Sequence, residues 1–326
     1  MPVKSYKFKP MININLHLSA LIFASLIVGG CTVNNDNKQN FGVYYPADTN
    51  KIKDDIKSSL PELEETYPGF DYNNVIKANA KMIPDGMSIT KFRHFVIFSD
   101  MDDELTYKLI DNDIRNTTDA MTNNYVNKMP DKITPIYLFE EYDEYRKFVL
   151  KNFDIAENDI SPYGFFKISK NVIVIRYVSW KGSILHEVTH RFIRSDFPDA
   201  PSWFDEGFAS LNEKSTFKNG NLIGDFSLRI IPLRRAIQNN TYTDLKHLMN
   251  TNDEELYGKR TSYYYAQSRY LLMYLQQSGL LDKYYKKFRD SYSDDETGIS
   301  QLEETTGKPL NIIENDYLDF IKSFKE

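Results

Sequence analysis

The spacing of apolar residues divides the chain into segments of two kinds. Residues 92–99, 132–139 and 163–177 are rich in β-branched and aromatic residues, which predicts strands, with two strands in the last segment. Residues 51–90 are broken by prolines, and short helices are expected there. Apolar residues recur at helical spacing in 103–127, 141–153, 227–238, 243–249, 261–278, 280–290 and 309–324. Strands interleaved with helices, followed by helices alone, predict an α+β fold with a mixed sheet and a C-terminal helical lobe.

The N-terminus has the pattern of a bacterial lipoprotein signal. Lys4, Lys7 and Lys9 precede an apolar stretch at 18–28, and Gly29-Gly30-Cys31 follows it. Such signals are cleaved before a cysteine that is then acylated, so we expect Cys31 to carry a lipid. The alternative is an incidental cysteine in an ordinary signal peptide or membrane anchor.

Composition along the rest of the chain suggests its organisation. After the signal peptide at 1–30, residues 31–50 are polar and poor in aliphatic side chains, as expected of a tether. The remainder, 51–326, is long enough for one large domain, which we divide into an α/β lobe at 51–200 and a helical lobe at 201–326.

Charge and cysteine content narrow the classes of partner. The chain has a net charge of -6 and a pI near 5.5, and basic residues do not cluster beyond the signal. Because nucleic-acid binding needs a concentrated basic patch, we expect no nucleic-acid partner. Cys31 is the single cysteine, which excludes an intramolecular disulfide. The 23 tyrosines and 21 phenylalanines are expected mainly in packing.

Two histidines one helical turn apart form the strongest chemical signal. In the run His186-Glu187-Val188-Thr189-His190, both imidazoles lie on one helix face and can bind the same metal ion. The helix is expected to start near Gly182-Ser183, and Leu185, Val188 and Phe192 form an apolar stripe that would dock on the core. The histidines should therefore face a cleft on the opposite side.

A second helix is expected to return towards these histidines. Pro198 and Pro201 end the first helix, and Ser202 with Asp205 resembles a capping box that opens the next. Glu206 lies on this second helix and is a natural third zinc ligand, which leaves Glu187 as general base. Asp205 either orients a histidine or serves only as the cap partner.

Two plainer interpretations of the motif remain. The His-Glu-x-x-His face can be merely solvated, with Glu206 favoured near a helix start by the helix dipole. The second interpretation is a structural zinc site, although such sites favour cysteine ligands and have no coordination position open to water. With five histidines in 326 residues, chance seldom produces this pattern. His94 and His247 have no partner pattern and are expected to be structural.

The runs Ile184-Leu-His-Glu-Val-Thr-His190 and Pro201-Ser-Trp-Phe-Asp-Glu-Gly-Phe-Ala209 resemble the gluzincin metallopeptidases, and among them the bacterial peptidase MA-like family. The likeness extends over residues 90–290, through the order of strands and helices before the motif and the helical segments after it. In this resemblance His186, His190 and Glu206 correspond to the ligands of one zinc ion, and Glu187 to the catalytic base. The gap between His190 and Glu206 is shorter than in thermolysin or aminopeptidase N, so only the metal site is carried over.

The resemblance implies a zincin-like fold and a zinc metallopeptidase that hydrolyses peptide or protein substrates. It also suggests Tyr265 as the group that stabilises the oxyanion, with Tyr263 and Tyr264 as rivals. With Cys31 lipidated, we expect a monomeric enzyme anchored to a bacterial membrane outside the cytoplasm. An amidase of peptidoglycan stem peptides and a non-catalytic lipoprotein that binds peptide or metal are the alternatives.

Overall fold

The computed structural model describes residues 63–178 and 182–324. The signal peptide at 1–30, the lipidation site Cys31 and the tether at 31–50 lie outside the described residues. Within the described ranges, every helix is too short or too polar to cross a membrane.

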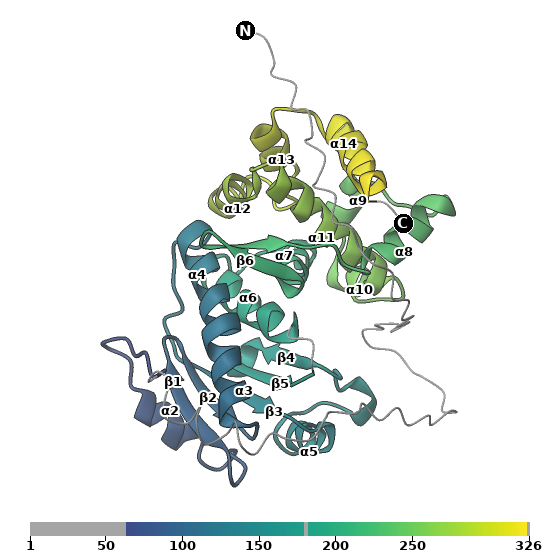
Figure 1. Cartoon of the computed structure of the whole chain (residues 1–326). Helices are drawn as coiled ribbons and strands as arrows, with labels where there is room; N and C mark the ends of the chain where they lie inside the picture. Colours follow the sequence, from purple (N-terminus) through teal and green to yellow (C-terminus); the bar gives the residue numbers. More distant parts are fainter. Residues whose placement is uncertain (1–62, 179–181, 325–326) are drawn as a thin grey trace, which may run out of the picture.

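A five-stranded mixed sheet forms the lower part of the molecule in Figure 1. The strand order is β1-β2-β3-β5-β4, with β2, β3 and β5 parallel and the two edge strands antiparallel to their neighbours. The strands are β1 (Ser88–Phe92), β2 (Phe95–Ser99), β3 (Thr134–Phe139), β4 (Gly164–Lys167) and β5 (Val172–Arg176).

Both faces of the sheet are covered by helices. Alternate residues of the central strands, such as Ile97, Ile136 and Ile173, pack into the larger core on the side of the metal-motif helix, and their neighbours pack into a second core. Because the side chains are buried on both faces, these strands are apolar at nearly every position. The covering helices before the motif are α2 (Tyr72–Asn79), α3 (Asp103–Lys108), the π-helical turn η1 (Leu109–Ile114), α4 (Arg115–Asn124) and α5 (Tyr142–Asn152).

Helices α6 (Gly182–Asp196), α7 (Ser202–Glu213) and α11 (Thr261–Gln277) pack in the middle of the molecule (Figure 1). Helix α6 contacts β4 and β5 on one side and α7 on the other. Gly207 permits the close approach of α7 and α11, because a Cβ there would lie 2.8 Å from the Cβ of Ser268. The residue next to Glu206 therefore has to be small.

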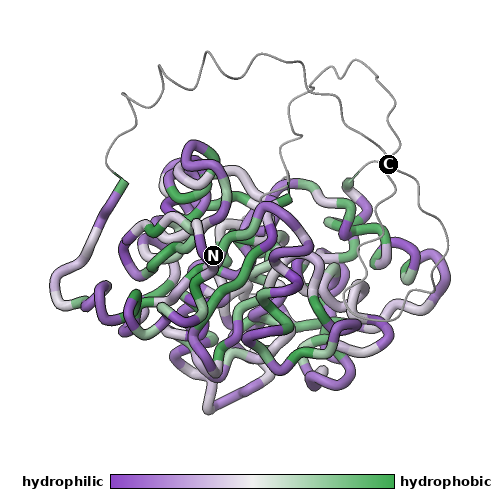
Figure 2. Tube along the Cα trace, turned by 90° about the horizontal axis from the view of Figure 1, so that it is seen from below, coloured by the Kyte–Doolittle hydropathy of each residue, from purple (hydrophilic) through white to green (hydrophobic). Residues whose placement is uncertain are grey.

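The C-terminal helices surround α11 and form the upper part of the molecule in Figure 1. Their apolar faces extend the larger core, so the green apolar stretches in Figure 2 run through the interior and purple ones lie outside. These helices are α8 (Ile230–Gln238), α9 (Leu245–Met249), α10 (Asp253–Leu256), α12 (Leu281–Asp290), α13 (Ile299–Thr306) and α14 (Leu310–Ser323).

The α+β class is confirmed, and most expected elements are present within a few residues. The strand expected at 92–99 is present as β2 but starts only at Phe95, because Arg93 has a left-handed backbone (φ 49°) and turns the chain between β1 and β2. The second half is not purely helical either, since the hairpin of β6 (Ser215–Lys218) and β7 (Asn221–Gly224) follows α7. Helices α10 and α13 and strand β1 were also not expected from the sequence.

Candidate metal centre

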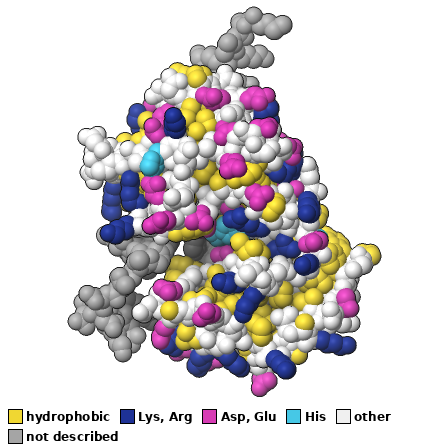
Figure 3. Space-filling model, turned by 180° about the vertical axis from the view of Figure 1, so that it is seen from behind, with side chains coloured by type: hydrophobic (Ala, Val, Ile, Leu, Met, Phe, Trp, Pro, Cys, Tyr) yellow, Lys and Arg dark blue, Asp and Glu magenta, His cyan; other side chains and the backbone are white. Residues whose placement is uncertain are grey.

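Helix α6 buries its apolar stripe in the core and places the two histidines at a pocket. Leu185, Val188 and Phe192 are buried in the core, at 5%, 0% and 0% exposure. His186 and His190 lie one turn apart on another side of the helix, with ring centroids 4.7 Å apart. Both line a pocket with a volume of about 430 Å³. Figure 3 shows a histidine side chain in the recess between the sheet-containing part and the helical part of the molecule.

Helix α7 brings Glu206 to the same point. Its Oε2 lies 3.2 Å from Nε2 of His186 and 3.4 Å from Nε2 of His190, and the two Nε2 atoms are 3.0 Å apart. These three residues form the one group of His, Cys, Asp and Glu side chains in the described ranges that is spaced to hold a metal ion. Oε2 of Glu206 is buried and lies within contact distance of both histidine nitrogens.

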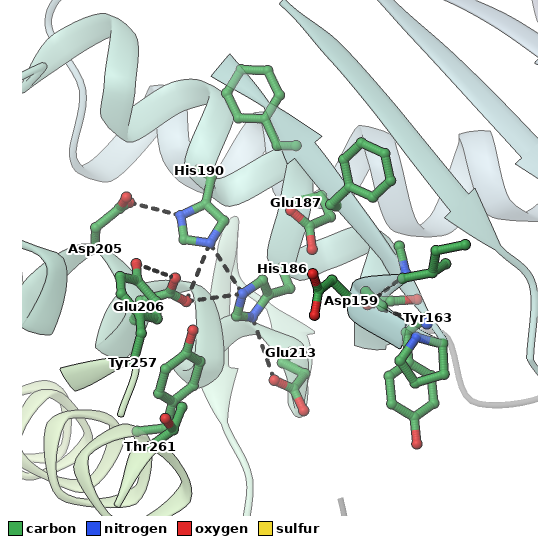
Figure 4. A pocket seen from close by; sticks show the side chains of 18 of the residues that line it. Asp159, Tyr163, His186, Glu187, His190, Asp205, Glu206, Glu213, Tyr257 and Thr261 are labelled. Atoms are coloured by element: carbon green, nitrogen blue, oxygen red, sulfur yellow. Dashed lines mark hydrogen bonds and ion pairs between the residues drawn. The ribbon is translucent and has the colours of Figure 1, made fainter. Parts of the chain in front are cut away.

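The remaining polar atom of each candidate ligand faces a partner outside the group. Nδ1 of His190 is 2.8 Å from Oδ1 of Asp205, and Nδ1 of His186 is 3.4 Å from Oε2 of Glu213. The Tyr257 hydroxyl donates a hydrogen bond of 2.9 Å to Oε1 of Glu206. Figure 4 shows these contacts as dashed lines around the histidine pair. The three outer partners orient the ligands so that Nε2, Nε2 and Oε2 point at one another.

Each of the two outer carboxylates is held by an arginine. Arg194 contacts Oδ2 of Asp205 at 2.6 Å, and Arg229 binds Glu213 through two hydrogen bonds of 3.1 and 2.7 Å. Burial by itself would raise the pKa of Glu213, but the positive charge of Arg229 lowers it to about 2. Glu213 is therefore ionised, as a partner of a histidine N–H must be.

Without a metal, the acidic surroundings favour protonated histidines. Burial lowers the pKa of His186, but hydrogen bonds from its ring to Glu206 and Glu213 raise it overall to about 9. The pKa of His190 is also raised well above 6.5, chiefly by Asp205 and Glu206 against the effect of burial. A bound cation would replace these protons.

Glu187 lines the pocket but lies apart from the ligand group. Burial raises the pKa of its carboxyl group, and the positive charges of His186 and His190 partly oppose that rise. The backbone amide of Phe166 on strand β4 donates a hydrogen bond to this carboxylate. In Figure 4 Glu187 lies on the other side of the histidines from Glu206. Its position thus differs from that of a third ligand.

Among the tyrosines of α11, only Tyr265 lines the pocket. The hydroxyl groups of Tyr263 and Tyr264 are engaged elsewhere, with Thr243 and Glu255 respectively. Burial and the neighbouring Glu206 raise the pKa of Tyr265, so its hydroxyl keeps its proton. Tyr265 therefore keeps a protonated hydroxyl beside Glu206 at the pocket wall.

The capping box expected at Ser202 and Asp205 is wrong. Helix α7 begins at Ser202 after Pro201, and no side chain caps it. The Ser202 hydroxyl donates instead to Asp253 at 2.6 Å, and Asp205 is engaged with His190 and Arg194. Of the two roles left open for Asp205, the structure therefore shows the contact with a histidine.

The two other described histidines stand outside the pocket. His94 is buried against aromatic rings, and burial lowers its pKa to about 4, so it is neutral. His247 is partly exposed and lies 2.6 Å from Glu255. Their lack of a metal-binding pattern agrees with the expectation from the sequence.

Sequence reasoning missed Glu213, Tyr257 and the two arginines. Glu213 had a readable signal, because it lies seven residues after Glu206 and therefore on the same face of α7, two turns along. Tyr257 had none, since it follows Glu206 by 51 residues and reaches the site through the turn before α11. No protein-family model matches the chain, and no curated protein matches its sequence.

Proposed function

We propose that this chain is a zinc-dependent peptidase of the gluzincin type, with His186, His190 and Glu206 as metal ligands and Glu187 as general base. The proposal rests on the directions in which the polar atoms of the three candidate ligands point. Two Nε2 atoms and Oε2 of Glu206 converge within 3.4 Å, while Nδ1 of His190 and Oε1 of Glu206 are hydrogen-bonded outside the group and Nδ1 of His186 lies 3.4 Å from Glu213. Such outer contacts are characteristic of metal-binding histidines and carboxylates.

The donor set fits zinc. Two imidazoles and one carboxylate suit this ion, and three protein ligands leave a position for a water molecule, as in catalytic zinc sites. When bound, zinc would supply a Lewis acid that lowers the pKa of water and polarises a carbonyl group. The buried Oε2 of Glu206, which lies 3.2 and 3.4 Å from the two histidine Nε2 atoms, supports this fit, because a cation held between these atoms would compensate the burial of the carboxylate.

In this proposal Glu187 moves the proton. Its raised carboxyl pKa makes it a stronger base than an exposed glutamate, and the Phe166 amide orients it. Glu187 takes a proton from the attacking water and gives it to the nitrogen of the leaving amine. Tyr265 donates a hydrogen bond to the carbonyl oxygen as negative charge develops there.

Strand β4 favours an extended peptide as substrate. It is the last strand of the sheet, pairs with β5 on one side, and lines the pocket with Gly164, Phe165 and Phe166. An edge strand beside a pocket can add a peptide through main-chain hydrogen bonds. Because the Phe166 amide already binds Glu187, such a peptide would bond to the other main-chain groups of β4. We propose that the substrate lies along β4, with its scissile bond at the metal.

We also propose that the enzyme acts outside the cytoplasm on a lipid anchor at Cys31. The support is the basic head, apolar stretch and Gly-Gly-Cys ending at the N-terminus.

Substitution of the two glutamates tests the function. Glu187→Gln keeps the shape but removes the base, so it should retain about one zinc per chain and lose roughly a hundredfold or more in hydrolysis. Glu206→Ala removes a ligand and should lower zinc content and hydrolysis together. Glu144→Gln, an exposed substitution on α5, serves as the matched control and should change neither.

Metal analysis should be combined with cleavage of quenched-fluorescent peptides and of peptidoglycan stem peptides. The two substrate sets separate a peptidase from an amidase. Full hydrolysis by Glu187→Gln would show that the base is wrong. A wild-type protein that binds no zinc when zinc is supplied would refute the metal site itself, and zinc binding without hydrolysis of either set would indicate a binding protein.

A further inference from the structure

The charges that line the pocket are unevenly distributed. Two arginines face it, and each is already paired with a carboxylate of the candidate metal centre. Glu206 faces the histidines, and Glu187 has the backbone amide of Phe166. The one remaining carboxylate of the pocket is Asp159. Among the residues that the structure describes, the pocket therefore offers a negative charge, and no uncommitted arginine or lysine, to an incoming substrate.

Asp159 lies on a short 3-10 helix, η2 (Glu157–Asp159), between α5 and strand β4. Its side chain is exposed, and Figure 4 shows the carboxylate pointing into the pocket on the side of His186 and Glu187. In the part of the chain that the structure describes, no ion pair of this side chain is found. Glu157 on the same turn, by contrast, is paired with Arg146 and lies outside the pocket lining.

The wall next to Asp159 suits the stem of a long cationic side chain. Ile168, which is 56% exposed, and Pro162 line the same pocket. Lysine and arginine side chains lay their methylene groups along apolar surface and leave the charged end free for a carboxylate. An apolar wall that ends in an exposed aspartate matches this division between stem and head.

We propose that Asp159 is a specificity-determining residue that binds an ammonium or guanidinium group of the substrate, close to the scissile bond. The cation comes either from a lysine or arginine side chain or from the free N-terminus of a peptide. This inference rests on the proposed peptidase function and names its substrate class, peptides that carry a positive charge near the cleaved bond.

The test measures binding, so that it does not depend on hydrolysis. The zinc-loaded Glu187→Gln protein is titrated with dye-labelled alanine pentapeptides that carry one lysine, or uncharged norleucine, at each position in turn. Each peptide is made with a free and with an acetylated N-terminus. Fluorescence anisotropy gives the affinities. The same peptides are then measured with two double variants, in which Glu187→Gln is combined with Asp159→Asn or, as matched control, with Glu157→Gln.

We expect lysine at one position, or the free N-terminus, to bind about three- to tenfold more tightly than its neutral counterpart, and raised salt to reduce this preference. Asp159→Asn should abolish the preference, and Glu157→Gln should keep it. Loss of affinity on acetylation alone would identify the amine as the cation, and loss on norleucine substitution alone would identify the side chain.

Equal affinities for charged and neutral peptides, including no measurable affinity for either, would overturn the role of Asp159. A preference that survives Asp159→Asn would overturn it as well. Failure of the peptidase function is seen separately, as absence of hydrolysis by the wild-type zinc protein.

Discussion

Zinc binding to the metal-free protein should release more than one proton from the histidine pair near pH 8. The raised pKa of His186, about 9, means that about nine-tenths of this side chain is protonated at that pH. The pKa of His190 is also raised well above 6.5, against the effect of burial, by Asp205 and Glu206. With unperturbed histidines, only about one-thirtieth of each ring would carry a proton.

The zinc affinity and the stability of the metal-free fold should change with pH in opposite directions. Because a metal binds neutral imidazole, protons compete with zinc wherever the pH lies below the raised pKa values. Between about pH 6.5 and 8, the apparent zinc affinity should therefore rise with pH by more than about tenfold per unit, as expected when more than one proton is displaced. The metal-free fold should show the opposite trend, losing stability as pH rises from about 6.5 through the pKa near 9 of His186.

Isothermal titration calorimetry in buffers of different ionisation enthalpy counts the released protons. A water molecule that becomes acidic on zinc adds at most about one more. Asp205→Asn removes the main charge that raises the pKa of His190, so it should reduce the count by up to about one proton. Asp319→Asn, at an exposed position on α14, should leave the count unchanged.

A total of one proton or fewer would refute this account, because water alone could then supply it. An unchanged count in Asp205→Asn would show that Asp205 does not raise the pKa of His190.

The remaining predictions separate the tyrosines and test the anchor. Tyr257→Phe removes the donor to Oε1 of Glu206 and should weaken zinc affinity about tenfold, measured by competition with a chelator. Tyr265→Phe should instead lower kcat by about tenfold or more at unchanged zinc content, and full activity would assign the oxyanion to another donor. Cys31→Ser should abolish acyl labelling and release the protein from the membrane fraction, whereas unchanged labelling would remove the lipoprotein assignment.

Local sequence was enough to predict the helix that carries the motif. The spacing of His186 and His190 and the stripe of Leu185, Val188 and Phe192 depend only on helical geometry, so both are found as expected. The hairpin β6–β7 was also readable, because Asn219-Gly220 has positive φ at both residues, the turn that Asn-Gly favours between short strands. It was missed because helical spacing dominates the surrounding segments.

Tertiary structure decided which polar groups meet. Ser202 does not cap the helix, because its hydroxyl donates a hydrogen bond to Asp253, 51 residues later. Tyr257 reaches Glu206, and Arg229 reaches Glu213, only through the packing of α7 against the segments that follow it. Helical periodicity specifies the face on which a side chain lies, because it acts over a few residues. Hydrogen-bond partners far apart in the chain, and with them the pKa values of the pocket, depend on how the helices pack.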